Sequence, residues 1–177
     1  FGALMLLACF LLNAPFICAI LGIFWCFAPL FMYYGDMRTE EEKPDESEKE
    51  ELKKIAAATW RFYEKFCTKE NNFLPPDNFQ EEPKKPPVAN TSPTNIAMYV
   101  VSAVCAETLG FISHDDAAER MENLLSTLGK LEKWKGQLFN WYNIKSLRPL
   151  RPQYISTVDS GNLLASLWLA KKHFADR

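Results

Sequence analysis

Hydrogen-bonding side chains gather in the stretch YISTVDSGNL, which leads into the apolar run LLASLWLA. Ser156 and Asp159 have the S-x-x-D spacing of a capping box, in which each side chain satisfies a free backbone N–H of the first helical turn. The cap leaves Thr157, Ser160 and Asn162 without a role. Many neutral hydrogen-bonding groups at one place are typical of a site for a hydroxyl-rich ligand.

The stretch NTSPTNIAMYVVSAV has the same order of residues about 65 positions earlier: hydroxyls, then an amide or acid, then an apolar helix. Inner helices whose N-terminal ends carry long loops, alternating with outer helices, are the arrangement of an α/α toroid. In such a ring the inner N-termini converge on one pocket. The residues predicted to line it and to bind substrate are Asn95, Trp141, Tyr142, Thr157, Asp159 and Asn162, with Thr94 and Ser160 beside them.

Alternative roles remain open for several of these residues. Ser156 is better explained as a cap than as a ligand contact, whereas Asn95 and Asp159 are open between the two roles because their neighbours already provide caps. Trp141 and Tyr142 are adjacent and cannot both be buried on one face of a strand, which favours the pocket for them. Three other aromatic residues are predicted to belong to the core: Trp60, Phe62 and Trp168.

Four predicted helices, over about 47–66, 93–109, 114–131 and 157–175, must position these residues. The first begins at a second capping box, Ser47 with Glu50, and carries an apolar stripe from Leu52 to Phe66. The second is bracketed by Ser92 and Pro93 at its start and Gly110 beyond its end. The second and fourth helices are apolar nearly all round and are predicted to be buried. The first and third are apolar on one face only and are predicted to be outer helices.

Two long loops precede the buried helices. The stretch NNFLPPDNFQEEPKKPPVANTSPT has no periodicity, but a flexible linker has little use for Phe73, Leu74 and Phe79, so we predict an ordered loop. The stretch GQLFNWYNIKSLRPLRPQYIS alternates aromatic and polar residues around a turn and predicts a short hairpin or an extended loop.

The first 35 residues contain no charged side chain, and all 42 charged residues follow Gly35. We predict transmembrane helices over 1–35, as the end of one span (1–12) and a complete span (16–34), since about 20 apolar residues cross a bilayer. A secretory signal peptide is less well supported because no basic region precedes the apolar stretch. A charged linker is predicted over 36–46, followed by the helical domain over 47–177.

The rest of the composition excludes several classes of function. The 20 basic and 22 acidic residues nearly balance, so no nucleic-acid partner is predicted. Five cysteines without a C-x-x-C pair indicate free thiols in a reducing compartment, and hence a cytoplasmic soluble part. His114 and His173 lie far apart beside charged runs, so neither a metal site nor a histidine-based catalytic site is predicted, and no cofactor is expected in this stretch.

Several motifs carry a resemblance to a known family: TWRFYEKF, FLPPDNFQEEP, TSPTNIAMYVVSA and LFNWYNIKSLRPLRPQYISTVDSGNL. Together they resemble the start of the glycoamylase-like domain in the middle of cyclic β-1,2-glucan synthases, over most of residues 47–177. The sequence departs from the family's usual TNIG and NWYD at Ala97 and Asn143. The loss of the acid at Asn143 removes one possible contact and leaves the framework intact.

The resemblance implies a mainly α fold, in which transmembrane helices precede the first four helices of an (α/α)6 barrel. It implies that this barrel rearranges β-1,2-glucan chains by transglycosylation and closes the ring, in the inner (plasma) membrane. A membrane-embedded glycosyltransferase that uses UDP-glucose would precede the barrel, and a phosphorylase-like domain would follow it. The alternatives are a non-catalytic carbohydrate-binding or structural α/α module and a helical protein-interaction scaffold.

The carboxylates predict that this stretch alone has no glycosidic activity. Sugar transfer needs two carboxyl groups ~5–9.5 Å apart, and only Asp159 is predicted at the pocket mouth. Asp77, Glu81 and Glu82 lie in a loop that offers no burial to raise a pKa. The catalytic pair is therefore expected beyond Arg177, and no residue of this sequence is assigned as catalytic.

Overall fold

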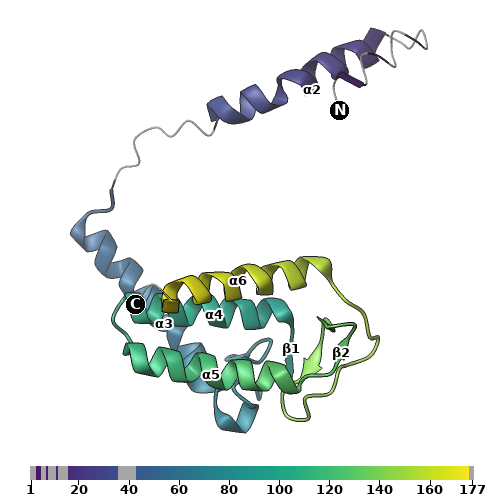
Figure 1. The fold of residues 1–177 in the computed structure, drawn as a ribbon. Coiled ribbons are helices and arrows are strands. Elements are labelled where there is room, and N and C mark those ends of the chain that lie inside the picture. Colours follow the sequence, from purple (N-terminus) through teal and green to yellow (C-terminus); the bar gives the residue numbers. More distant parts are fainter. Residues whose placement is uncertain (1–2, 5–6, 8–10, 12–15, 36–42, 176–177) are drawn as a thin grey trace. The chain divides into compact units, whose positions relative to one another are not determined.

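The computed structural model describes residues 3–4, 7, 11, 16–35 and 43–175, and the chain divides into two units, 1–45 and 46–177 (Figure 1). The elements in chain order are α2 (Phe16–Gly35), α3 (Glu46–Phe66), the 3₁₀ helix η1 (Lys69–Asn71), β1 (Asn90–Thr91), α4 (Pro93–Thr108), α5 (His114–Lys130), β2 (Lys133–Trp134), β3 (Gln137–Leu138), β4 (Tyr142–Asn143) and α6 (Thr157–Ala175). The four predicted helices of the second unit are confirmed as α3, α4, α5 and α6.

The first unit contains α2, a 20-residue helix without a charged side chain. Within the described part of the chain, its segment Cys18–Gly35 is the one stretch long and apolar enough to cross a membrane, with a mean hydropathy of 1.6 and 6% of the segment buried. The predicted span over 1–12 and the predicted linker over 36–46 lie mostly outside the described residues. The division into membrane segment, linker and domain stays a prediction.

Helix α4 is the centre of the second unit. Its N-cap is Ser92, whose hydroxyl accepts the backbone N–H of Asn95 at 3.2 Å, and Pro93 occupies the first turn, as predicted. Gly110 follows the end of the helix with φ of 76°, a conformation that favours glycine. Most of the helix is buried, but Met98 is 51% exposed, so the prediction of burial on every side is wrong for one strip of α4.

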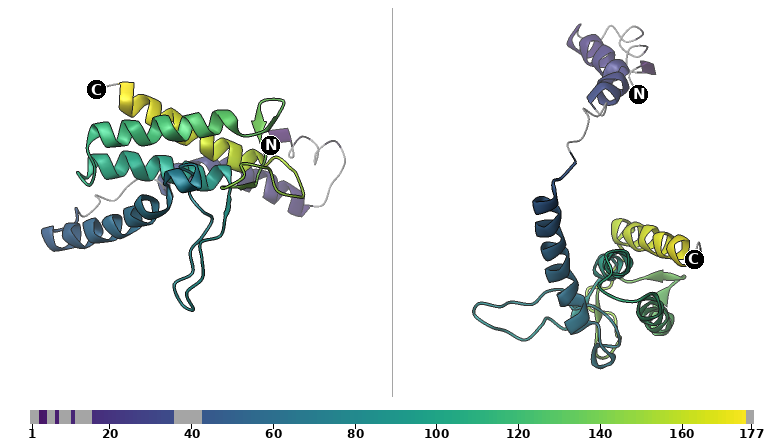
Figure 2. Two further views of the ribbon diagram at one scale, coloured as in Figure 1. Left: turned by 90° about the horizontal axis from the view of Figure 1, so that it is seen from below. Right: turned by 90° about the vertical axis from the view of Figure 1, so that its left-hand side faces the viewer.

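Helix α3 packs on α4 only through its second half. It begins at Glu46, so Ser47 lies inside its first turn instead of capping it. Of the predicted apolar stripe, Leu52 and Ile55 are 57% and 63% exposed, because the first half of the helix extends away from the other helices (Figure 2). Trp60 is buried as predicted, with its ring stacked 6.5 Å from that of Tyr99.

Helix α5 is one-sided, as its sequence predicts. The hydroxyl of Ser113 accepts the backbone N–H of Asp116 at 3.1 Å and caps its start. The buried face is made of Ala117, Met121, Leu124, Thr127 and Leu128. The helical spacing of the apolar residues also assigns Leu125 to the buried face, but this side chain is 52% exposed.

Helix α6 packs closely on α4 and has few other neighbours. Leu163, Ser166 and Ala170 are buried against the core. Leu164 and Trp168 are 68% and 60% exposed, so the predicted all-round burial of this helix, and of Trp168 in particular, is wrong here. These side chains are exposed because α6 has few helical neighbours. Figure 2 shows that α5 and α6 both lie beside α4, and that no helix covers most of the surface of α6.

The two long loops are ordered and joined to each other. In the first, Leu74 is fully buried, and the Phe79 ring packs 5.1 Å from that of Phe66, which confirms the prediction of an ordered loop. In the second, β2 and β3 form a hairpin whose turn residues Lys135 and Gly136 have φ of 48° and 84°. The strands β1 and β4 pair antiparallel and so tie the loop before α4 to the loop before α6.

Candidate functional site

Helices α4 and α6 run parallel, so their N-terminal ends lie at the same end of the domain. The side-chain N–H of Asn162, in the second turn of α6, donates to the hydroxyl of Thr94, in the first turn of α4, at 3.1 Å. At the other end of the pair, His173 of α6 contacts Glu107 of α4. We call the polar end the mouth, and its residues are Thr94, Asn95, Asn140, Trp141, Tyr154, Asp159 and Asn162.

Asp159 is the central acceptor of the mouth. Its backbone N–H donates to the hydroxyl of Ser156 at 3.2 Å, which confirms the predicted cap. Burial acts to raise the pKa of its carboxyl group, but hydrogen bonds from Ser156 and from the hydroxyl and backbone N–H of Thr94 outweigh that effect. The pKa of Asp159 therefore lies below its usual value, and the side chain is ionised at neutral pH.

Asn140 connects Asp159 to two aromatic residues. In the orientation that satisfies both ends of its amide, its N–H donates to Asp159 Oδ2 at 3.0 Å. Its oxygen then accepts from the hydroxyl of Tyr154 at 2.8 Å and from the indole N–H of Trp141 at 3.0 Å. Since Asn140 is 6% exposed whereas Tyr154 is 46% exposed, a buried amide holds aromatic rings that remain accessible. Trp141 is half-buried.

Tyr142 is separated from the other predicted site residues. It is fully buried, its hydroxyl donates to the backbone oxygen of Glu132 at 2.6 Å, and the backbone N–H of Phe139 donates to it at 2.8 Å. Of the adjacent pair, Trp141 is half-buried beside the other mouth residues, whereas Tyr142 lies in the core. Burial raises the pKa of the Tyr142 hydroxyl.

The side chain of Asn95 holds a second carboxylate, that of Asp77, at the N-terminal end of α4. Its side-chain N–H donates to Asp77 Oδ1 at 2.9 Å, and the backbone N–H of Asp77 donates to the carbonyl of Asn90 at 2.7 Å. Asp77 is therefore held by the ordered loop, and the expectation that Asp159 alone would bring a carboxylate to this end is wrong. Glu81 and Glu82 are exposed, as the loop composition suggests.

Thr157 and Ser160 contribute less to the mouth than predicted. Thr157 is exposed and lies roughly 160° around the helix axis from Asp159, at about 100° per residue. The hydroxyl of Ser160 donates to the carbonyl of Ser156 at 2.8 Å, so its hydrogen is already committed to a bond within the helix.

Sequence reasoning did not single out Asn140 or Tyr154 as site residues. Tyr154 is the first residue of the stretch YISTVDSGNL, and Asn140 immediately precedes Trp141, so the available signal was a polar or aromatic residue next to a predicted one. Their role depends on contacts between residues 14 positions apart in an irregular loop, which no periodicity reveals.

At the opposite end, Glu107 joins three helices. Its side chain is 3% exposed and contacts His114 Nδ1 of α5 at 2.9 Å and His173 Nε2 of α6 at 2.5 Å. We call these residues the base cluster. The two histidines that the sequence separates are thus brought together on one carboxylate. They contact it directly, and within the described ranges no group of three or more His, Cys, Asp or Glu side chains is arranged to hold a metal.

The two departures from the motifs, at Asn143 and Ala97, lie in a turn and in the core of α4. The side-chain oxygen of Asn143 accepts the backbone N–H groups of Lys145 and Ser146 at 3.0 and 2.9 Å, closing a turn that an aspartate would close equally well. Ala97 is 1% exposed within the core of α4. Neither position lies on the mouth surface.

The helical unit is similar in fold to part of a glucoamylase-like structure. A crystal structure of a candidate glucoamylase from Bacteroides fragilis NCTC 9343 superposes with a TM-score of 0.57, over 73% of this chain and 32% of that one, at 14% sequence identity. This similarity establishes the fold alone.

The chain belongs to the family of proteins of unknown function DUF3131, whose sequence profile matches residues 54–176. It is also 40% identical over 158 residues to the cyclic β-(1,2)-glucan synthase NdvB of Rhizobium meliloti strain 1021. That alignment covers 88% of this chain and 6% of the synthase, so the chain spans a small part of this relative. The resemblance drawn from the motifs is confirmed.

Proposed function

We propose that this chain is the first part of the glucan-processing domain of a membrane-bound cyclic β-1,2-glucan synthase, and that its mouth binds the glucan chain. The observation that carries the proposal is the convergence of Thr94, Asp159 and Asn162 from two parallel helices onto one surface. The 40% identity to the Rhizobium synthase supports the choice of glucan.

The chemistry of the mouth suits a sugar chain. Asn162 and Thr94 offer amide and hydroxyl groups, and the ionised Asp159 is a strong acceptor for sugar hydroxyls. The Trp141 indole is fixed through its N–H, which leaves its ring faces for the C–H faces of a sugar. A carboxyl group with a lowered pKa is a poor acid catalyst at neutral pH, so Asp159 binds and orients the substrate instead of protonating it.

Ring formation needs a pair of carboxyl groups, which we assign to later helices of a complete (α/α)6 barrel. Asp77 is the member of this chain best placed to assist such a pair, because Asn95 fixes its side chain at the end of α4. We expect the isolated stretch to produce no new glucan chain lengths or rings. Product formation by residues 36–177 that an Asp77→Asn substitution abolished would contradict this assignment.

In this proposal α2 anchors the chain in the plasma membrane, between a glycosyltransferase domain and a phosphorylase-like domain, with the second unit in the cytoplasm. Exposed Ser126 on α5 is a suitable reporter of this orientation. A Ser126→Cys variant of the full-length protein should react with an impermeant maleimide only after cells are opened. Efficient labelling of this position in intact cells would show that the second unit lies outside the cytoplasm.

Glucan binding is tested by titrating linear β-1,2-glucan into the full-length protein that contains this chain. Trp141→Ala should weaken glucan binding at least tenfold. The substitution removes the stacking surface, and it also removes one of the two donors to the side-chain oxygen of Asn140. Trp134→Ala is the control, since Trp134 is a second accessible tryptophan that lies on the β2–β3 hairpin and makes none of the mouth contacts. Equal affinity of the two variants and the unsubstituted protein would refute the proposal.

A non-catalytic carbohydrate-binding module is the second candidate, favoured by the lowered pKa of Asp159, which suits hydrogen bonding better than acid catalysis. It predicts that mouth substitutions change affinity while turnover at saturating glucan stays constant. In the catalytic-domain proposal, Asn162→Ala lowers turnover as well, because the substrate is misplaced relative to the reacting groups.

A further inference from the structure

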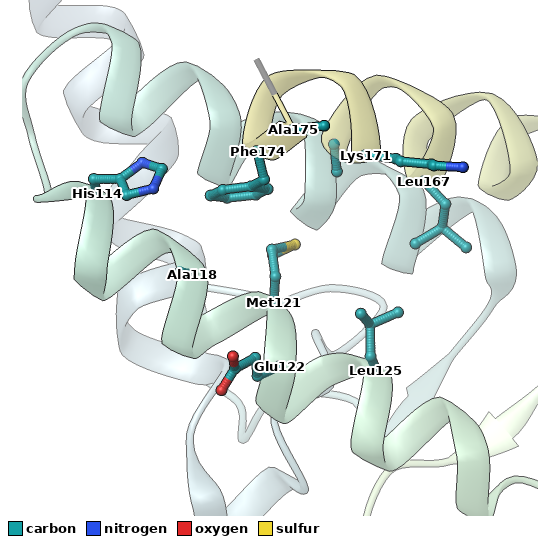
Figure 3. Close-up of a pocket in the computed structure, with 10 residues that line it drawn as sticks. His114, Ala118, Met121, Glu122, Leu125, Leu167, Lys171, Phe174 and Ala175 are labelled. Carbon is teal, nitrogen blue, oxygen red and sulfur yellow. The ribbon is translucent and has the colours of Figure 1, made fainter. Parts of the chain in front are cut away.

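Two exposed surfaces of different chemistry adjoin α5. Along the helix, Leu125 faces Leu167 and Phe174 of α6 across an apolar pocket of about 640 Å³ (Figure 3). An aliphatic lining of this kind suits packing against further protein. At the C-terminal end of α5, the β2–β3 hairpin carries Trp134, which is 54% exposed. The residues around this tryptophan are lysines, so the second surface suits a different partner.

The hairpin gives Trp134 a well-supported position. This residue precedes a two-residue turn with positive φ angles, of the tight type that joins adjacent strands. Buried Tyr142 holds both ends of the hairpin, because its hydroxyl donates to the carbonyl of Glu132 at 2.6 Å and accepts the backbone N–H of Phe139 at 2.8 Å. The indole is therefore displayed on a fixed element instead of a loose loop.

The charges near Trp134 are mainly positive. The stretch KLEKWKGQL contains three lysines and one acidic residue. The amine of Lys133 donates to backbone carbonyls at the end of α5, at 2.6 and 3.1 Å, and so caps that helix. Lys130 and Lys135 are exposed, and the Lys135 amine lies 4.8 Å from the centroid of the Trp134 ring. One short stretch thus presents an accessible indole and two accessible ammonium groups.

This combination matches the interface of a lipid bilayer. An indole is an apolar ring with a polar N–H, and tryptophan is enriched at the level of the lipid headgroups. Lysine amines are attracted to anionic headgroups, which they reach on long side chains. A protein partner is a poorer match, because lysine is depleted from protein–protein interfaces.

The membrane anchor of the proposed function lowers the affinity that such a surface needs. Helix α2 ends at Gly35 and α3 begins at Glu46, so ten residues join them. Ten residues span at most about 36 Å when fully extended. A domain tethered this closely meets the bilayer surface at a high effective concentration, so a weak contact of one tryptophan and two lysines is sufficient.

We propose that Lys130, Trp134 and Lys135 bind the surface of a bilayer that contains anionic lipids. The inference rests on the proposed function only in taking α2 as a membrane anchor. The hairpin lies at the mouth end of the domain, because Gly136 lines one pocket together with Pro93 in the first turn of α4. The contact would therefore place the mouth close to the bilayer surface.

Photo-cross-linking in the full-length protein tests the inference. The protein is reconstituted in vesicles of equal parts phosphatidylcholine and phosphatidylglycerol and carries Trp134→benzoylphenylalanine, which keeps a large aromatic side chain. Lipid adducts should be at least tenfold more abundant than with the same probe at Asp115, an exposed residue about 20 Å away along α5. Equal lipid adducts at the two positions, or adducts at position 134 only to glucan or to protein, would overturn the proposal.

A charge-neutral variant tests the lysines without disturbing the turn. Lys135→Asn introduces a residue that tolerates positive φ, and Lys130→Gln removes the second charge. With both substitutions, lipid adducts at position 134 should fall at least threefold. Lys84→Gln with Lys85→Gln, which removes two exposed lysines from the first long loop, is the matched control. Equal adduct yields in the two double variants would contradict the proposal.

The outcome is separable from that of the proposed function. A protein that alkali washes off the vesicles would refute the membrane anchor and this inference together. A protein that stays on the vesicles and gives no lipid adduct at position 134 would refute the inference alone. Glucan affinity measures the mouth independently, and Trp134→Ala should leave it unchanged.

Discussion

The two ends of the α4–α6 pair both use a carboxylate to join helices, yet they differ in exposure and in what surrounds the charge. At the base, the Glu107 side chain is 3% exposed and is held by two histidines. At the mouth, Asp159 is half-buried among amide, hydroxyl and indole groups. In our proposal the closed cluster at the base stabilises the helix arrangement, whereas the open network at the mouth binds the glucan.

The largest expected effect is at the base. Replacing Glu107 with Gln removes a buried carboxyl group that two histidines contact, and the loss of one partner of such a buried pair destabilises proteins by about 3 kcal/mol. The urea dependence of hydrogen exchange in peptides of α4 and α6, in the full-length protein, measures the loss.

Two controls show whether the base cluster is only structural. His114→Asn should cost less stability than Glu107→Gln, because the His114 side chain is 44% exposed. Under conditions in which the Glu107→Gln variant remains folded, its affinity for β-1,2-glucan should equal that of the unsubstituted protein. A tenfold loss of affinity without loss of stability would remove the distinction between the two ends.

An intermediate effect is expected at Asp159. Asp159→Asn should weaken glucan binding about tenfold, because a charged acceptor becomes a neutral amide worth about 1–2 kcal/mol less in hydrogen bonding. Isothermal titration of the full-length variant with linear β-1,2-glucan checks this. Asp116→Asn, in the equivalent turn of α5 and away from the mouth, provides the matched control.

The pH dependence of stability sharpens the same comparison. Because the folded pKa of Asp159 lies below its unfolded value of about 3.9, its contribution to stability is fully present above that value and is lost as the pH falls through the folded pKa. The stability difference between the unsubstituted protein and Asp159→Asn should be constant from about pH 5 to 8 and shrink below about pH 4. A stability difference between the two proteins that varied between pH 6 and 8 would mean that a group other than Asp159 controls the pH dependence.

The smallest effect is expected at Tyr154. Tyr154→Phe removes one hydroxyl donor to Asn140 and leaves the ring in place, so stability should fall by about 1 kcal/mol and glucan affinity only a few-fold. Denaturant titration and glucan titration of the same variant measure both. A larger loss of glucan affinity than Trp141→Ala causes would show that the main sugar contact is Tyr154 and not Trp141.

Local signals in the sequence predicted the parts of this fold that depend on local physics. Ser92, Ser113 and Ser156 each accept a backbone N–H as their cap spacing indicates, and the four helices of the second unit follow the predicted pattern. The ordered first loop was also predictable, because buried Leu74 fills a position that a flexible linker would leave polar.

Contacts between distant residues were not predictable in the same way. Glu107 meets a histidine 66 positions later, and Asp77 meets an asparagine 18 positions later, after a loop without periodicity. The exposure of Trp168 has a different cause: an apolar helix surface indicates what a helix can bury, and it does not say which neighbours are present.

The most direct test of the account is hydrogen exchange of the full-length protein with and without linear β-1,2-glucan. Glucan should slow exchange in peptides that contain Thr94, Asn140–Trp141 and Asp159–Asn162, and leave the peptides around Glu107, His114 and His173 unchanged. Protection at the base cluster with none at the mouth, or no protection at either end at saturating glucan, would contradict the claim that the mouth is the glucan site.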